Sequence, residues 1–240
     1  MSDRKLRIGC ASGFWGDTPE AIGQLVSKGE IDYLVFDYLA EVTMSLMARA
    51  RAKSPDAGYA PDFVKALAPW LSEIKAKGMK VVANAGGVNP RGCRDALAKV
   101  AAEAGIDVSI GVVLGDDLSA RADDIRAGGQ TEMFSGVAFP DDIWSMNAYL
   151  GARPIAAALD AGADIVITGR CADSAVALGP LMHEFGWGDD DWDKLSQGSL
   201  AGHLIECGPQ GTGGNFTDWQ DVSGWDDMGM PIVEVSEDGS

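Results

Sequence analysis

Short apolar runs rich in β-branched residues constrain the fold of this chain more than any other feature. They lie near residues 7–11, 32–36, 80–83, 108–114 and 164–168, and the segments between them are long enough to hold helices. Strands that alternate with helix-length crossovers form parallel sheets, and a continuous apolar run suits a strand covered on both faces. The sequence therefore predicts an α/β fold of the doubly wound type, with a mostly parallel sheet and helices on both faces.

The stretch 163–187, ADIVITGRCADSAVALGPLMHEFGW, is the clearest single unit. A strand is expected up to Thr168, a polar turn follows, and Asp173 stands where it would cap a helix that begins at Ser174. Other patterns predict helices from Thr18 and over 39–52, 62–77, 91–104, 145–161 and 199–206, and a further strand over 230–235.

The chain divides by composition at Trp187. Residues 1–187 are expected to form a Rossmann-like core. Residues 188–240 are acidic, aromatic and rich in glycine, and we expect them to pack on the core as an extension. We expect this extension to continue in a longer protein, because the chain stops in EDGS so soon after the strand expected over 230–235.

Polar or glycine residues follow every predicted strand. If the strands are parallel, these residues meet at one edge of the sheet, where ligands of open α/β folds bind. Turn formation and helix capping are the structural alternative for each group taken alone. The convergence of carboxylates, amides and one arginine favours a binding site.

Four carboxylates are the candidate catalytic acids and bases: Asp37, Glu41, Asp116 and Asp173. Asp37 and Glu41 are four residues apart, so they share a face if a helix begins at Asp37. Neighbouring carboxylates move each other's pKa values apart and can divide acid and base roles. Asp173 is equally consistent with a simple cap. Asp116 and Asp117 point in different directions, and with no further oxygen ligands at fixed spacing we expect no metal site.

Arg170 is the candidate for holding an anionic group of a substrate, because its planar fork of donors fits a carboxylate or a phosphate. A structural role, in which Arg170 pairs with Asp173 or Asp116, remains the alternative. Neutral hydrogen-bond donors at polar and glycine-rich turns complete the predicted substrate-binding set: Ser12, Gly13, Asn84, Gly86, Gly87, Asn89, Gly213, Gly214 and Asn215.

The net charge of −17 argues against nucleic acid and an anionic membrane surface as partners. No apolar run reaches the roughly 20 residues of a spanning helix. The 4 cysteines are scattered without metal-binding spacing, which is typical of reduced thiols in a cytoplasmic protein. We expect a small-molecule substrate, and a homo-oligomer is compatible with the sequence.

Several segments, in the same order along the chain, resemble the acyclic terpene utilisation protein A family. They include ASGFWGD (11–17), VVANAGGVNP (81–90), ADIVITGR (163–170), HEFGW (183–187) and TGGNFTDW (212–219), within matches that run from residue 8 to 235. The resemblance implies a bacterial, cytoplasmic α/β protein in the catabolism of citronellol- and geraniol-type compounds, which proceeds through branched acyl-CoA thioesters.

The resemblance leaves two functions open. The first is an enzyme that acts on a branched acyl-CoA or related carboxylate by acid–base chemistry of the hydratase or lyase type. No cofactor is evident beyond coenzyme A as part of the substrate. The alternative is a non-catalytic subunit of the same pathway that binds an acyl-CoA or a partner enzyme.

Overall fold

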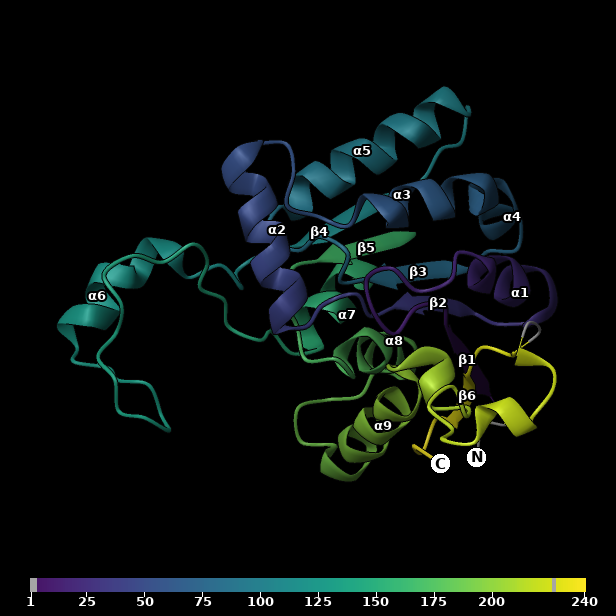
Figure 1. The fold of residues 1–240 in the computed structure, drawn as a ribbon. Helices are drawn as coiled ribbons and strands as arrows, with labels where there is room; N and C mark the ends of the chain where they lie inside the picture. The colour runs from purple at the N-terminus through teal and green to yellow at the C-terminus, as the bar shows by residue number, and fades with distance from the viewer. Residues whose placement is uncertain (1–3, 226–227) are drawn as a thin grey trace.

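The computed structural model describes residues 4–225 and 228–240 and contains one six-stranded sheet in the order β4-β5-β3-β2-β1-β6 (Figure 1). The strands are β1 (Lys5–Cys10), β2 (Tyr33–Phe36), β3 (Lys80–Ala83), β4 (Ile110–Val113), β5 (Ile165–Thr168) and β6 (Ile232–Ser236). The first five strands are parallel to one another, and β6 runs antiparallel to β1 at the edge of the sheet. The predicted α/β fold and its five parallel strands are confirmed.

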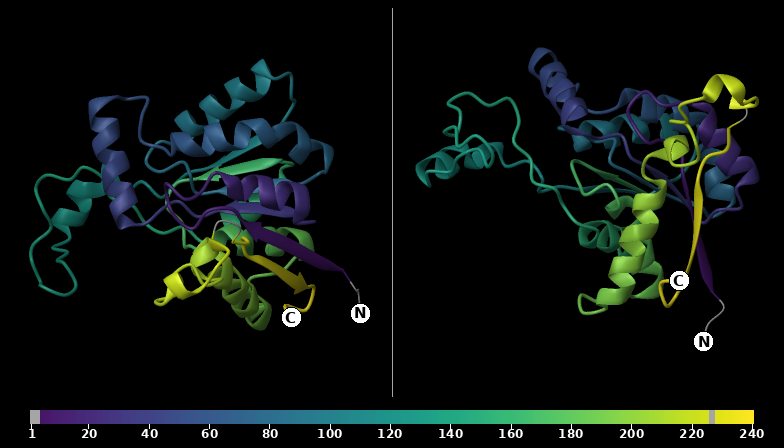
Figure 2. Two further views of the ribbon diagram at one scale, coloured as in Figure 1. Left: turned by 45° about the vertical axis from the view of Figure 1, so that its right-hand side comes forward. Right: turned by 60° about the horizontal axis from the view of Figure 1, so that its bottom comes forward.

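Helices cover both faces of the sheet (Figures 1 and 2). One face carries α1 (Glu20–Lys28), α3 (Pro61–Leu67), α4 (Leu71–Ala76) and α5 (Pro90–Glu103), and the other carries α7 (Arg153–Asp160), α8 (Ala175–Phe185) and α9 (Trp192–Ile205). A hydrophobic core lies on each face of the sheet, and successive strand residues point into opposite cores. Phe36 and Ala83 pack on the side of α1 and α5, whereas Val35 and Val82 pack on the side of α8.

Three predicted helices differ from the observed helices by more than two residues at one end or are interrupted. The segment 62–77 is divided into α3, a 3₁₀ turn over Ala68–Trp70 and α4, because Pro69 has no N–H to donate inside a helix. In the segment 145–161 only α7 is helical. Residues before it use their backbone elsewhere, with Ala148 N–H donating to the Asp116 carbonyl and Leu150 N–H to the Arg170 carbonyl. The short helix expected over 199–206 is the end of α9, which begins at Trp192.

Asp173 does not cap α8, contrary to the sequence-based expectation. The N-cap residue is Ser174, and it makes no side-chain cap. The Asp173 carboxylate instead accepts a hydrogen bond from Arg170. A charge-assisted bond to a guanidinium is stronger than a bond to a neutral backbone N–H, which accounts for the difference.

The winding of the chain reverses between β3 and β5. Helix α5 follows β3 on one face, and α8 follows β5 on the opposite face, although the two strands are neighbours in the sheet. In doubly wound proteins, ligands bind outside the carboxyl ends of the strands at such a reversal. The loops that carry Asn84 and Arg170 leave the sheet at this position.

One segment stands away from the body of the molecule on the side of the carboxyl ends of the strands, next to α2 (Glu41–Lys53) (Figures 1 and 2). We call this segment, residues 119–146, the arm. It contains a 3₁₀ turn (Ser119–Arg121) and α6 (Ala122–Ala127). Two more 3₁₀ turns, Gly208–Gln210 and Trp219–Asp221, lie between α9 and β6. Within the described residues, no helix is long and apolar enough to cross a membrane.

Candidate functional site

Asp37 and Asn84 form a buried pair at the carboxyl ends of β2 and β3. Each follows a residue that faces α1 and α5, so strand alternation turns both toward α8. Asn84 Nδ2 donates to Asp37 Oδ1 at 2.6 Å, and Asn84 Oδ1 accepts from Tyr38 N–H at 2.6 Å. The amide therefore fixes the position of the carboxyl group.

Burial raises the pKa of the Asp37 carboxyl to about 7, since only 6% of the residue is exposed and the charged form is poorly solvated. The hydrogen bond from Asn84 opposes this shift, the Asp173 carboxylate adds to it, and the Arg170 guanidinium opposes it. A carboxyl group with this pKa exchanges its proton near neutral pH, as a general acid or base must.

Arg170 is 4% exposed and uses one end of its guanidinium to hold the surrounding loops. Nη1 donates to the Leu39 carbonyl at 2.7 Å, to the Cys171 carbonyl at 3.2 Å and to Asp173 Oδ1 at 2.7 Å. Nε is buried and has no hydrogen-bond partner among the described residues, and Nη2 lies 3.8 Å from Glu41 Oε1. The Nη1 end of the guanidinium therefore holds the loops, and the Nε/Nη2 edge lies on the side of Glu41.

Tyr149 and Glu41 cover this arginine. The Tyr149 ring centre lies 4.0 Å from the Arg170 guanidinium carbon, and the Tyr149 hydroxyl donates to Glu41 Oε1. This hydrogen bond lowers the pKa of Glu41, so the carboxylate is charged at neutral pH. The Glu41 side chain is 80% exposed, which leaves it free to move away from Arg170.

Asp116 supports the loop that carries Arg170. Its Oδ2 accepts from Arg170 N–H at 2.8 Å and from Asn147 Nδ2 at 2.9 Å, and burial raises its pKa. Gly169 lies so close to Asp116 that a Cβ there would be 2.4 Å from Oδ2. We refer to Asp37, Asn84, Asp116, Arg170 and Asp173 as the rim network.

Ser12 lies next to the rim network on the other side of β2. Its carbonyl accepts from Asp37 N–H at 2.9 Å, and its hydroxyl donates to the Phe14 carbonyl at 2.8 Å. The structure thus brings Ser12, Asp37, Asn84, Asp116 and Arg170 to one edge of the sheet. Direct hydrogen bonds join Asp37 to Ser12 and Asn84, and join Asp116 to Arg170.

Close packing explains the glycines at this edge better than anion binding does. A Cβ on Gly13 would lie 2.3 Å from the Cys207 carbonyl carbon, and one on Gly86 would lie 2.5 Å from the Thr168 carbonyl oxygen. Gly86 N–H already donates to that oxygen at 3.0 Å. Gly87 has a φ of +53° and packs against Met47.

Asn89 caps α5, with its Oδ1 accepting from Gly92 N–H at 3.1 Å. Gly213, Gly214 and Asn215 lie in the exposed segment after α9, where their hydrogen bonds are local. Gly214 N–H donates to the Pro209 carbonyl and Asn215 Nδ2 to Gln210 Oε1, so neither bond reaches the rim network.

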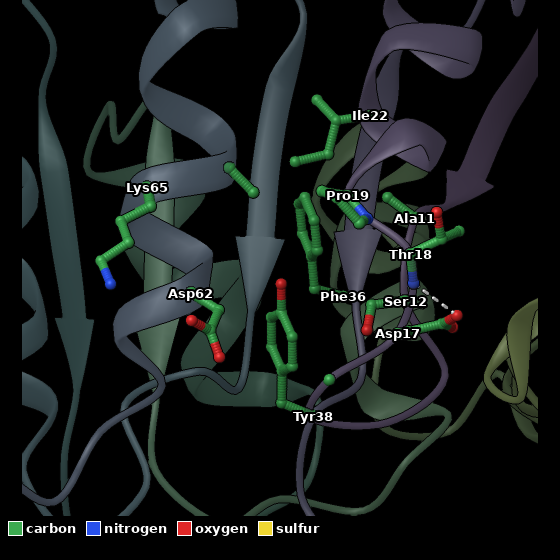
Figure 3. Close-up of a pocket in the computed structure, with 12 residues that line it drawn as sticks. Ala11, Ser12, Asp17, Thr18, Pro19, Ile22, Phe36, Tyr38, Asp62 and Lys65 are labelled. Atoms are coloured by element: carbon green, nitrogen blue, oxygen red, sulfur yellow. Dashed lines mark hydrogen bonds between the residues drawn. The ribbon is translucent and has the colours of Figure 1, made fainter.

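A cavity of about 460 Å³, which we call cavity A, opens beside Ser12 between α1 and α3 (Figure 3). The Tyr38 hydroxyl points into the space beside Phe36, whereas the Lys65 ammonium group points away from it. The lining combines apolar and polar residues: Ala11, Ser12, Gly16, Asp17, Thr18, Pro19, Ile22, Phe36, Tyr38, Asp62, Lys65 and Ala66. Its volume lies in the range of small-molecule sites.

Sequence reasoning missed Tyr38 and Tyr149. Tyr38 follows Asp37 directly, so the alternation of an extended chain places it on the opposite face, and this signal is visible in the sequence. Tyr149 reaches Arg170 only because residues 147–150 pair with the loops after β4 and β5, which is a long-range contact. In the part of the chain that the structure describes, no group of three or more metal-binding side chains could hold an ion.

The model of one protein family, described as acyclic terpene utilisation family protein AtuA, matches residues 6–240. The match covers nearly the whole chain and includes every element of the site. Searches of curated proteins and of solved structures each gave no significant match.

Proposed function

The chain belongs to the acyclic terpene utilisation family, and on this basis we propose that it is an enzyme that acts on a branched acyl-CoA thioester or related carboxylate. Membership of the family implies a part in acyclic terpene utilisation. The proposed chemistry is acid–base catalysis of the hydratase or lyase type. Coenzyme A enters only as part of the substrate.

The observation that carries this proposal is that Asp37 and Arg170, two buried ionisable groups, lie at the carboxyl edge of the sheet, close enough for the guanidinium to oppose the pKa shift of Asp37. Asp37 is a buried carboxyl whose pKa of about 7 suits proton transfer. Arg170 is a buried cation whose Nε has no partner among the described residues. A buried donor without a partner is costly unless a ligand completes it, and an anion does so best.

Each residue of the rim network then has a distinct task. In the addition of water, Asp37 accepts a proton from water and then gives it to the substrate. In the removal of water, Asp37 accepts a proton from the substrate and gives it to the departing hydroxyl group. Arg170 binds the ligand anion through its Nε/Nη2 edge. Asn84 positions the Asp37 carboxyl, and Asp116 and Asp173 position Arg170. Cavity A offers an apolar surface for the branched hydrocarbon chain.

A specific observation favours the second function, a non-catalytic subunit that binds the same compounds. Cavity A lies on the α1 side of the sheet, whereas the Asp37 carboxyl faces the α8 side. A ligand confined to cavity A would be bound without meeting the proposed base. All four cysteines are free, which fits the cytoplasmic location that we propose for either function.

Purified protein with citronellyl- and geranyl-type CoA thioesters separates these functions. For the enzyme we expect turnover, with Asp37→Asn lowering kcat by about 10²–10⁴-fold at little change in KM. Asp95→Asn, an exposed carboxylate on α5, is the matched control and should keep full activity. Binding without turnover would establish the non-catalytic function, and the absence of both would refute the two proposals together.

A further inference from the structure

The arm carries the two most exposed large apolar side chains of the described chain, Phe134 and Met133. Met133, Phe134, Val137 and Trp144 are between 64% and 88% exposed. In the three views of Figures 1 and 2 the arm projects from the body, and its tip lies away from α2. Apolar side chains gathered on one projection are typical of an interaction surface.

The arm is held in shape by its own hydrogen bonds. At the tip, Glu132 N–H donates to the Val137 carbonyl at 2.8 Å, and the Glu132 carboxylate accepts from Phe134 N–H at 3.0 Å. Nearer the body, Arg126 donates to the carbonyls of Pro140 and Asp141 at 3.0 and 2.9 Å. The tip therefore presents its apolar side chains on a formed turn, so binding would not have to order a flexible segment.

Helix α2 offers a complementary surface beside the root of the arm. Val42 and Leu46 are 71% and 52% exposed on it. Two open hollows, of about 360 and 400 Å³, lie between α2 and the root of the arm. Their lining is mixed: Ala48, Trp144 and Ser145 line both, Arg51 lines one and Arg49 the other. The tip of the arm stands apart from α2 within one copy (Figure 1). The exposed side chains Val42 and Leu46 are therefore not covered by the tip of their own arm.

The charges of the two surfaces are opposite. The arm contains five acidic and two basic residues, whereas α2 contains one acidic and three basic residues in a chain with a net charge of −17. The basic residues of α2 (Arg49, Arg51 and Lys53) are exposed. An acidic apolar arm and a basic apolar helix attract each other, while most other surfaces of two copies repel.

We propose that this protein forms a symmetric dimer in which the arm of each copy docks on α2 of the other. A second copy is the partner that covers both surfaces at once, because a twofold axis repeats the contact of arm and helix. The proposal rests on the arm and α2 alone and is independent of the catalytic proposal.

Light scattering after size-exclusion chromatography of the full chain tests the dimer. The expected mass is twice the 25.1 kDa of one chain. Phe134→Asp at the arm tip and Leu46→Asp on α2 should each shift the protein toward the single-chain mass, with unchanged circular dichroism because both side chains are exposed. Val222→Asp, an exposed apolar residue of the segment after α9, is the matched control and should remain dimeric.

Mixing the two variants tests the pairing of arm with α2. In the mixed dimer, the intact arm of Leu46→Asp meets the intact α2 of Phe134→Asp, so one of the two contacts is restored. We expect more dimer in the mixture than in either variant alone. A single-chain mass for the wild-type protein across a dilution series would overturn the proposal. Equal loss of mass in the Val222→Asp control, or no gain on mixing, would also overturn it.

Discussion

Replacing Asp37 with asparagine should make the stability of the protein less dependent on pH. Asparagine has nearly the same shape as aspartate and keeps an oxygen that can accept from Asn84 Nδ2 and Leu39 N–H. It cannot ionise. Comparison of the two proteins across pH therefore isolates the free energy that ionisation of Asp37 costs the folded state.

The magnitude follows from the pKa of Asp37, which burial raises from 3.8 to about 7. Between these values the folded state binds more protons than the unfolded state, so the free energy of unfolding falls as pH rises. The stability is fully present below pH 3.8 and is lost by about pH 7. One pKa unit corresponds to about 1.4 kcal/mol, so the loss is about 4 kcal/mol in total and about 2 kcal/mol between pH 5 and pH 7.

Urea unfolding of both proteins at pH 5, 6, 7 and 8 measures this difference. Relative to Asp37→Asn, the wild-type protein should lose about 1.4 kcal/mol per pH unit up to about pH 6, lose less between pH 6 and pH 7, and level off above pH 7. Asp95→Asn, on the surface of α5, should follow the wild-type curve. A constant difference between wild type and Asp37→Asn from pH 5 to pH 8 would show that Asp37 is ionised throughout, and its role as a base near neutrality would lose its support.

Three further outcomes are expected. Gly13→Ala should destabilise the protein by about 1–3 kcal/mol in urea unfolding, because its Cβ would meet the Cys207 backbone, whereas Gly151→Ala, which has open space, should be neutral; equal midpoints would contradict the close packing. Glu41→Gln should strengthen the binding of citronellate about two- to fivefold, as measured by calorimetry. The reason is that it removes a carboxylate that competes with the ligand for Arg170 Nη2. Weaker binding would instead support Glu41 as a substrate contact. One thiol per native chain should react with a disulfide reagent, and Cys207→Ser should abolish the reaction, because Cys207 is the exposed cysteine. Burial raises the pKa of the other three thiols, Cys10, Cys93 and Cys171, to about 12. A second thiol that reacts quickly would refute this.

The strands could be predicted from the sequence because each is a short continuous apolar run with its own turn. The runs that end at Phe36, Ala83 and Thr168 are buried along their whole length or nearly so, and burial on both faces is what such a pattern indicates. The segment 145–152 has apolar residues at helical spacing, yet long-range pairing with residues 116 and 170 decides its conformation. No local pattern contains that information.

The grouping of polar residues at the carboxyl edge was also predictable, since it needs only parallel strands. The position at which the winding reverses could not be predicted, because it depends on β5 lying between β4 and β3 in the sheet. The sequence shows five strands in chain order and gives no spatial order. The reversal of winding between β3 and β5, the strands that precede Asn84 and Arg170, appears only when the sheet is assembled.

Arg170 shows why the structural and the functional interpretations of one residue need not exclude each other. Its Nη1 is bound to two carbonyls and to Asp173, as a structural clamp would be. Its Nε is buried and has no partner among the described residues, as a ligand-binding arginine would be. Because a guanidinium is rigid, holding Nη1 in place also fixes the direction of the Nε/Nη2 edge. The clamp therefore orients the edge that we propose binds the anion, and lysine at this position would lose both properties at once.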